Sequence, residues 1–230
     1  MNQHLFDTIA MQYLREDLHW GADIDVLKLA FEEALQVFDG RMNYMDVGCG
    51  PGFHLCAIKE MYPEVPALGI DPSPHMLKKA RERVGRLSLP FVSFEETEIL
   101  DIGNRMFGVI SCFNTLGNLR ECGVSPEDTR REIMRHASRL LMPGGSLVVS
   151  VYDLAKLTEP YGRNIQILPE SDRGSGDLLI EYSAPNGETA KYYSHWFTQA
   201  ELLCLFEKNG FKVDFLEQRM FRLVVKAYRA

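Results

Sequence analysis

The spacing of apolar positions divides the chain into two kinds of segment. In the first kind, apolar residues recur every three or four positions, which is the spacing of one face of a helix. In the second kind, they form short continuous or alternating runs, which are typical of strands. We expect helices at 5–14, 27–38, 53–62, 73–84, 125–142 and 198–209. We expect strands at 43–48, 67–71, within 90–100, and at 107–114, 145–153, 211–217 and 221–228.

Strand and helix patterns alternate as far as Asp153, and this alternation predicts a parallel sheet with helices on both faces. The last two strand patterns are joined by a short connection, so we expect them to pair antiparallel at the sheet edge. The predicted fold class is α/β. It is a doubly wound, Rossmann-like, mostly parallel seven-stranded sheet with an antiparallel edge strand, N-terminal helices and a small β-rich lid insertion.

Local signals mark the ends of several helices. We expect Asp23 or Asp25 to cap the helix that ends at 38. Thr198 and Glu201 have the spacing of a capping box, and Gly210 is placed to end the helix that follows.

The pattern changes after Asp153, where residues 154–196 show little helical periodicity. The sequence PNGE at 185–188, flanked by apolar and aromatic residues, predicts a hairpin. We interpret this region as a lid. The domain boundaries that we predict are 1–39 for a helical cap, 40–153 for the ligand-binding core, 154–196 for the lid and 197–230 for the completion of the sheet.

Composition narrows the class of protein. The chain has 230 residues and a net charge of −7, which disfavours a broad nucleic-acid surface. No apolar run is long enough to cross a bilayer, and the first residues do not resemble a signal peptide, so we expect a cytoplasmic protein without a membrane partner. Five cysteines without paired spacing indicate buried thiols rather than disulfides or a zinc site. We expect no metal.

The segment MDVGCGPGFHL, residues 45–55, contains three closely spaced glycines. A P-loop would need a lysine and a hydroxyl residue after the last glycine, where Phe53 and His54 stand. A dinucleotide fingerprint would need its third glycine at position 53, but this glycine comes one residue earlier, at Gly52. Asp46 would repel a pyrophosphate and attract a cationic group. The loop therefore favours a ligand that carries an ammonium.

Asp71 ends the next predicted strand, 19 residues after Gly52. An acid at this place commonly accepts hydrogen bonds from two ribose hydroxyls. Together with Asp46, it describes a site for a nucleoside that carries an ammonium instead of a pyrophosphate.

Four segments in this order resemble the motifs of the class I S-adenosylmethionine-dependent methyltransferases. They are MDVGCGPG, LGIDPSPHML, LLMPGGSLVVSVYD and HWFTQAELLCLFEKNGFKV. The resemblance covers residues 40–153 and 195–230, and it implies S-adenosylmethionine as cofactor and S-adenosylhomocysteine as product. It further implies a place for each of the following cofactor-binding residues: Asp46 at the ammonium, Gly48, Cys49, Gly50 and Gly52 along the methionine part, Asp71 at the ribose, Pro72, Met76, Glu98 and Ile99 at the adenine, and Phe113 and Asn114 at the sulfonium.

Residues for the methyl acceptor are less clearly marked. NTLGN, at 114–118, is similar to a segment of histidine α-amine methyltransferases, which implies a substrate role for Asn118 alongside Asn114; turn capping is the alternative. FDTIAMQY is similar to the opening of the family and implies that Tyr13 faces the methyl donor. His195 is a candidate base or substrate contact, or simply a packed residue. We interpret His54 as structural. The lid aromatics would form either a cage for an amine or a small core.

These observations predict a methyltransferase that acts on a small molecule, with a nitrogen acceptor preferred and oxygen second. Transfer in line from a sulfonium requires alignment more than a catalytic dyad, and the sequence shows no convincing dyad. Two alternatives stay open: a methyltransferase acting on RNA or protein, and a non-catalytic S-adenosylmethionine-binding regulator. We expect a monomer or homodimer that binds no nucleic acid.

Overall fold

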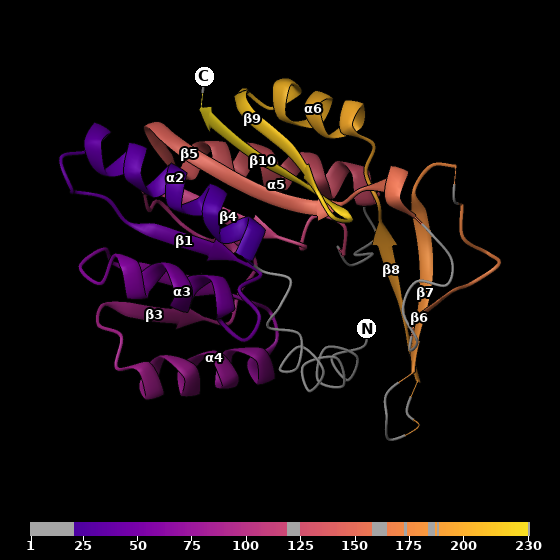
Figure 1. The fold of residues 1–230 in the computed structure, drawn as a ribbon, viewed down its shortest axis with the longest axis horizontal. Coiled ribbons are helices and arrows are strands. Elements are labelled where there is room, and N and C mark those ends of the chain that lie inside the picture. The colour runs from indigo at the N-terminus through magenta and orange to yellow at the C-terminus, as the bar shows by residue number, and fades with distance from the viewer. Residues whose placement is uncertain are drawn as a thin grey trace.

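The computed structural model describes residues 21–118, 125–157, 165–172, 174–183, 187 and 189–229. Its main element is a seven-stranded sheet in the order β3-β2-β1-β4-β5-β10-β9 (Figure 1). The strands are β1 (Tyr44–Val47), β2 (Ala67–Ile70), β3 (Val92–Glu95), β4 (Phe107–Phe113), β5 (Leu141–Tyr152), β9 (Phe211–Arg219) and β10 (Arg222–Arg229). β1 to β5 run parallel, and β10 runs antiparallel to both β5 and β9. The predicted α/β class and its antiparallel edge are confirmed, with β10 the reversed strand and β9 the outermost one.

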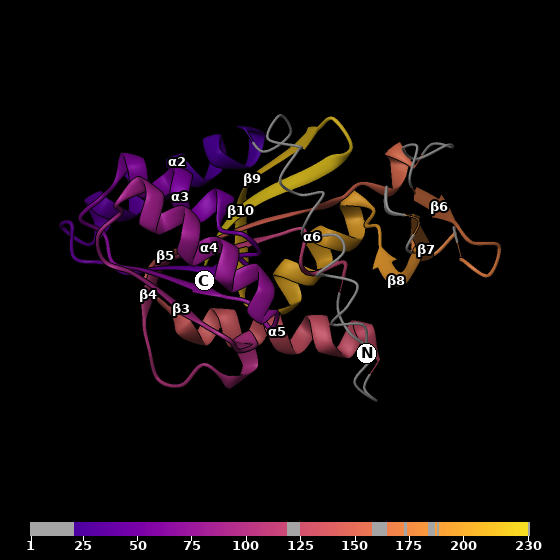
Figure 2. The same cartoon turned by 90° about the horizontal axis from the view of Figure 1, so that it is seen from below.

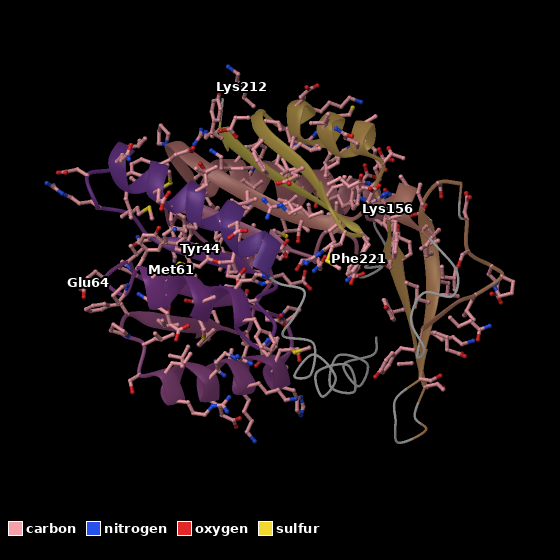
Figure 3. All side chains as sticks on the ribbon, viewed as in Figure 1. Tyr44, Met61, Glu64, Lys156, Lys212 and Phe221 are labelled. Carbon is pink, nitrogen blue, oxygen red and sulfur yellow. The ribbon has the colours of Figure 1, made fainter. Side chains whose placement is uncertain are left out.

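Helices cover both faces of the sheet (Figure 2). They are α2 (Gly21–Val37), α3 (Phe53–Met61), α4 (Pro74–Leu87), α5 (Pro126–Leu140) and α6 (Gln199–Lys208). Successive strand residues point to opposite faces, so Met45 and Val47 pack in the cluster under α5 and α6. Tyr44 packs in the cluster under α2 and α3, and Figure 3 shows it in the interior between these helices.

The lid prediction corresponds to a second, three-stranded antiparallel sheet, β6-β7-β8, beside the main sheet (Figure 1). Its strands are β6 (Ile165–Ile167), β7 (Asp177–Ser183) and β8 (Thr189–His195). β7 and β8 pair on either side of 184–188, where the hairpin turn was predicted and where only Gly187 is described. The lid has its own core around the fully buried Trp196, which stacks on Tyr152 at a ring distance of 4.9 Å.

Two predicted helix ends need correction. The helix α2 is already formed at Gly21, so neither Asp23 nor Asp25 is its cap; Asp23 is instead a fully buried residue of the first described turn. The helix α5 ends at Leu140 rather than at 142, because Leu141 already pairs with Phe107 as the start of β5.

The other helix ends follow the sequence signals. Ser73 and Ser125 cap α4 and α5 through their side chains. Thr198 accepts the Glu201 N–H at 3.1 Å, but the Glu201 carboxylate binds His195, so only half of the capping box forms. Gly210, at φ +80°, follows the end of α6.

No helix in the described ranges combines the length and the apolar character that a membrane span requires. Of the cysteines, Cys49, Cys56 and Cys112 are buried free thiols and Cys204 is partly exposed, whereas Cys122 lies outside the described residues.

Candidate active site

A cavity of about 280 Å³ opens at the carboxyl ends of β1, β2 and β4. Ligands of open parallel sheets bind at this edge. All the predicted cofactor-binding residues line it except Asp46 and Gly52. The lining set is Gly48, Cys49, Gly50, Asp71, Pro72, Met76, Glu98, Ile99, Phe113 and Asn114, together with Asn118 from the acceptor candidates.

The glycine loop is shaped by backbone conformation. Gly48, Gly50 and Gly52 all have positive φ, between +51° and +78°. A Cβ on Gly48 would lie 2.3 Å from Thr115 Oγ1, so this glycine lets the loop approach the end of β4. At Gly50 no atom of the described part of the chain lies within 4 Å of the position of a Cβ, which leaves open space in the cavity wall. A ligand can therefore approach the backbone at Gly50.

Asp71 connects the glycine loop to the second strand. Its Oδ2 accepts the Gly50 N–H at 2.9 Å, and its Oδ1 accepts the Ser73 N–H at 2.8 Å. Each carboxylate oxygen has a further lone pair, so the group can also accept hydroxyl donors from the cavity. Its position beside Gly50 fits the ribose role that the sequence implied.

Asp46 lies behind the glycine loop rather than in the cavity wall. Its carboxyl is buried on the α2 and α3 face of β1 and accepts a hydrogen bond of 2.6 Å from Ser111. Burial raises the pKa of Asp46 to about 6, although His54 and the Ser111 hydroxyl both act to lower it.

The loop after β4 brings two amides to the cavity. Asn114 has φ +51°, and its carbonyl oxygen accepts a hydrogen bond of 2.8 Å from Asn118 Nδ2. This bond fixes the Asn118 amide, because a flipped amide would place its oxygen against the Asn114 carbonyl. Among the described residues, the Oδ1 atoms of both side chains have no hydrogen-bond partner, and both atoms are buried. Buried acceptors in proteins normally have a donor, so these two oxygens are acceptors without an assigned partner.

His195 lies away from the cavity, where it joins the lid to the core. Its Nδ1 is 2.7 Å from Asp177 Oδ1 and its Nε2 is 2.8 Å from Glu201 Oε1. The expectation of a base or substrate contact does not fit this geometry, because both ring nitrogens face carboxylates of the protein. The main chain of His195 has a second contact, since its N–H donates to Gly117 O at 2.7 Å. His195 thus supports the Asn114–Asn118 loop from behind.

The two remaining candidate residues are Tyr13 and His54. Tyr13 lies outside the described residues, so its role stays a prediction. His54, which we interpreted as structural, is a lining residue of the cavity. The centroid of its ring lies 4.2 Å from that of the Phe113 ring.

Sequence reasoning did not identify the contribution of α5. Thr129, Glu132 and Ile133 line the cavity from this helix. Their spacing of three and four residues places them on one helix face, and this pattern was the available signal.

Comparisons with known proteins identify the family of the chain. A family model described as a methyltransferase domain matches residues 38–210. The chain belongs to this family. It is a class I S-adenosylmethionine-dependent methyltransferase domain, and S-adenosylmethionine is its cofactor.

One curated relative shows how similar the chain is to an individual protein. An arsenite methyltransferase from Halobacterium salinarum is 26% identical over 178 residues, which make up 69% of this chain and 42% of that protein. The chain thus spans less than half the length of this relative.

Solved structures share the fold. The methyltransferase CcbJ from Streptomyces caelestis superposes with a TM-score of 0.68 at 20% identity, over 87% of this chain and 89% of that one. CalS10, a SAM-bound amino pentose methyltransferase from Micromonospora echinaspora, superposes with a TM-score of 0.65 at 19% identity, over 96% and 95%.

The residues in the cavity fit the cofactor. The open approach at Gly50 leaves room beside the backbone for the methionine part. Asp71 offers acceptors to a ribose, and Ile99 and Met76 give apolar surface to an adenine.

Proposed function

We propose that this protein transfers a methyl group from S-adenosylmethionine to a nitrogen of a small amine, with a hydroxyl oxygen as the second choice. The cofactor supplies a methyl group that its sulfonium already activates. The chain mainly has to align donor and acceptor, which can contribute several kcal/mol to catalysis.

In this proposal the cofactor lies across the carboxyl ends of β1, β2 and β4. Gly48, Cys49 and Gly50 border its methionine part, with Gly52 beginning the helix behind them. Asp46 acts on its ammonium from below the loop. Asp71 holds the ribose, and Glu98 faces the adenine amino group between Pro72, Met76 and Ile99. Phe113 and Asn114 border the sulfonium, since Phe113 ends β4, Asn114 follows it, and both line the cavity.

The observation that carries the nitrogen acceptor is a pair of buried amide oxygens, Asn114 Oδ1 and Asn118 Oδ1, which have no partner among the residues that the structure describes. A buried acceptor without a donor costs about 1–3 kcal/mol. An amine can donate to both oxygens, whereas a hydroxyl has one proton to donate. Glu132 lines the same cavity from α5 and favours a cationic or proton-donating ligand. The structural neighbour CalS10, an amino pentose methyltransferase, also acts on a substrate that contains an amine.

The test is a labelled-methyl assay against matched panels of small amines, alcohols and RNA. We expect label on amines. For Asn118→Ala we expect kcat/KM for the best amine to fall about 10- to 100-fold, which corresponds to one lost bond to a buried acceptor site. Calorimetry should show unchanged affinity for S-adenosylhomocysteine. Asn43→Ala is the matched control, because Asn43 binds Met106 O in an exposed position. Label found only on RNA or on proteins would overturn the proposal.

A further inference from the structure

The lid meets the acceptor loop, residues 114–118, through a contact of main chain on main chain. At the end of β8 the His195 N–H donates to Gly117 O at 2.7 Å. A Cβ added to Gly117 would lie 2.5 Å from the His195 carbonyl oxygen, which is closer than Cβ atoms come to other atoms in proteins. The two segments can therefore touch only because residue 117 has no side chain.

The lid side of this contact is held in place from several directions. The ring of His195 lies between Asp177 Oδ1 at 2.7 Å and Glu201 Oε1 at 2.8 Å. The next residue, Trp196, donates its N–H to Gly176 O at 2.9 Å. β8 also pairs with β7 along the full length of both strands. The end of β8 is thus a fixed surface against which the acceptor loop rests.

The acceptor loop is anchored separately at its first residue. The Asn114 N–H donates to Ser150 O of β5 at 2.8 Å, which ties this end of the loop to the main sheet. Asn118, at the other end, bonds within the loop itself: its N–H donates to Thr115 O at 2.9 Å and its Nδ2 to Asn114 O at 2.8 Å. A displacement at Gly117 should therefore move the Asn118 amide and leave Asn114 in place.

We propose that Gly117 is a positioning residue for methyl transfer, through which the lid sets the place of the Asn118 amide. The inference rests on the proposed function, which assigns this amide to the acceptor nitrogen. A side chain at position 117 would push the loop away from His195, because a closely packed carbonyl that is fixed by its neighbours cannot give way. In an aligned site, a misplacement of about 1 Å can cost about 100-fold in rate.

Kinetics on the full chain test the proposal. For Gly117→Ala we expect kcat/KM for the best amine to fall about 10- to 100-fold, the range expected for Asn118→Ala. Affinity for S-adenosylhomocysteine, measured by calorimetry, should stay within about threefold of the wild type. Gly103→Ala is the matched control and should keep kcat/KM within about twofold. Neither glycine has a left-handed φ, and at Gly103 no atom of the described residues lies within 4 Å of a Cβ.

A double variant separates positioning from general damage. If Gly117 acts through Asn118, the alanine at 117 adds little once Asn118 is also alanine, and the double variant should lie within about threefold of Asn118→Ala alone. Losses that multiply would overturn the inference. So would a Gly117→Ala variant with the kcat/KM of the wild type, or one that loses cofactor affinity as strongly as it loses kcat/KM.

Hydrogen exchange of the ligand-free protein, followed by NMR, gives a readout that needs no acceptor. In Gly117→Ala the His195 N–H and the Asn118 side-chain amide should both exchange at least about tenfold faster, because each loses its hydrogen bond. The Trp196 N–H is the internal control and should exchange as in the wild type. Unchanged exchange at Asn118 would overturn the inference.

The exchange measurement also separates this inference from the proposed function. If the native protein methylates no amine, the proposed function fails, and exchange at Asn118 still decides the role of Gly117. If Gly117→Ala does not fold, His195→Gln takes its place, because loss of the ring loosens the same main chain. Exchange at Asn118 should then be faster in His195→Gln, and an unchanged rate there would count against Gly117.

Discussion

The two walls of the cavity are built on different principles. On one side, the loop of Gly48–Gly52 takes its shape from backbone conformations with positive φ and from a direct fit against Thr115. On the other side, the loop of Asn114–Asn118 is held by one hydrogen bond from the lid, from the His195 N–H to Gly117 O, and by its own bond from Asn118 Nδ2 to Asn114 O. The first wall is determined locally, and the second depends on a segment almost 80 residues away in the sequence.

This difference has a functional meaning. A cofactor common to a whole family can be bound by a fixed backbone cradle, because its shape does not change among members. An acceptor that differs between members needs a wall whose side chains can vary. The lid joins the core mainly at Trp196–Phe197 and at the end of β5, where Figure 3 labels Lys156 and Phe221. Changes in the lid can therefore reach the acceptor loop without disturbing the cofactor wall.

The largest expected effect compares two glycines of the same loop. Gly48→Ala adds a methyl group 2.3 Å from Thr115 Oγ1 at φ +65°, and we expect a loss of about 3 kcal/mol in the free energy of unfolding. For Gly50→Ala we expect a loss of only about 1 kcal/mol, because no atom of the residues that the structure describes lies within 4 Å of the new methyl group. Denaturant unfolding without ligand measures both.

Binding of S-adenosylhomocysteine should distinguish the two glycine variants further. In Gly50→Ala the methyl group takes up cavity space, so affinity for S-adenosylhomocysteine should fall about 100-fold although the protein stays folded. Equal losses of stability in the two variants, or full affinity in Gly50→Ala, would show that the loop is not a rigid backbone cradle.

A second, smaller effect concerns Asp46, whose pKa is raised to about 6 by burial. Between about pH 4 and pH 6 the folded state retains a proton that the unfolded state has released, so wild-type stability falls as the pH rises through this window. Asp46→Asn cannot ionise and avoids this loss. We expect its stability relative to the wild type to increase by about 2 kcal/mol between pH 4 and pH 7, while its affinity for S-adenosylmethionine decreases.

Urea unfolding of the ligand-free proteins at several pH values measures this trend. Ser111→Ala is a useful companion, because it removes the hydrogen bond that lowers the pKa of Asp46 and should steepen the same pH dependence. A difference between Asp46→Asn and the wild type that stays constant with pH would contradict the assignment.

The features that the sequence could predict are those set by local signals, and the features that it could not predict are set by contacts between distant segments. The order of strands and helices, the glycine loop and Asp71 were predictable, because each depends on local signals: periodicity, turn chemistry and an acid at a strand end. Asp23 was misassigned as a cap because nothing local shows that it meets Arg222, almost 200 residues later. His195 looked like a candidate base because the sequence does not show that Asp177 and Glu201 flank it. Contacts between distant segments decide these roles.

His195 also carries the smallest expected effect, in the second wall. His195→Gln removes a buried ring that lies between Asp177 of the lid and Glu201 of α6. Burial acts to raise the pKa of the Asp177 carboxyl, but hydrogen bonds, including those from Tyr193 and His195, outweigh it and hold this pKa below its usual value. Because both carboxylates are partly exposed, we expect only about 1 kcal/mol of lost stability.

The informative result is in the kinetics of this variant. Without the ring contacts, the main chain that supports Gly117 is less well fixed, and kcat/KM for the acceptor should fall about tenfold. Affinity for S-adenosylhomocysteine should stay within about twofold of the wild type, since no bond to the glycine loop is lost. Tyr193→Phe removes only the hydroxyl that donates to Asp177 and should have a weaker effect in the same direction. A large loss of cofactor affinity in His195→Gln would mean that the two walls are not separable, and that the lid holds the cofactor as well as the acceptor.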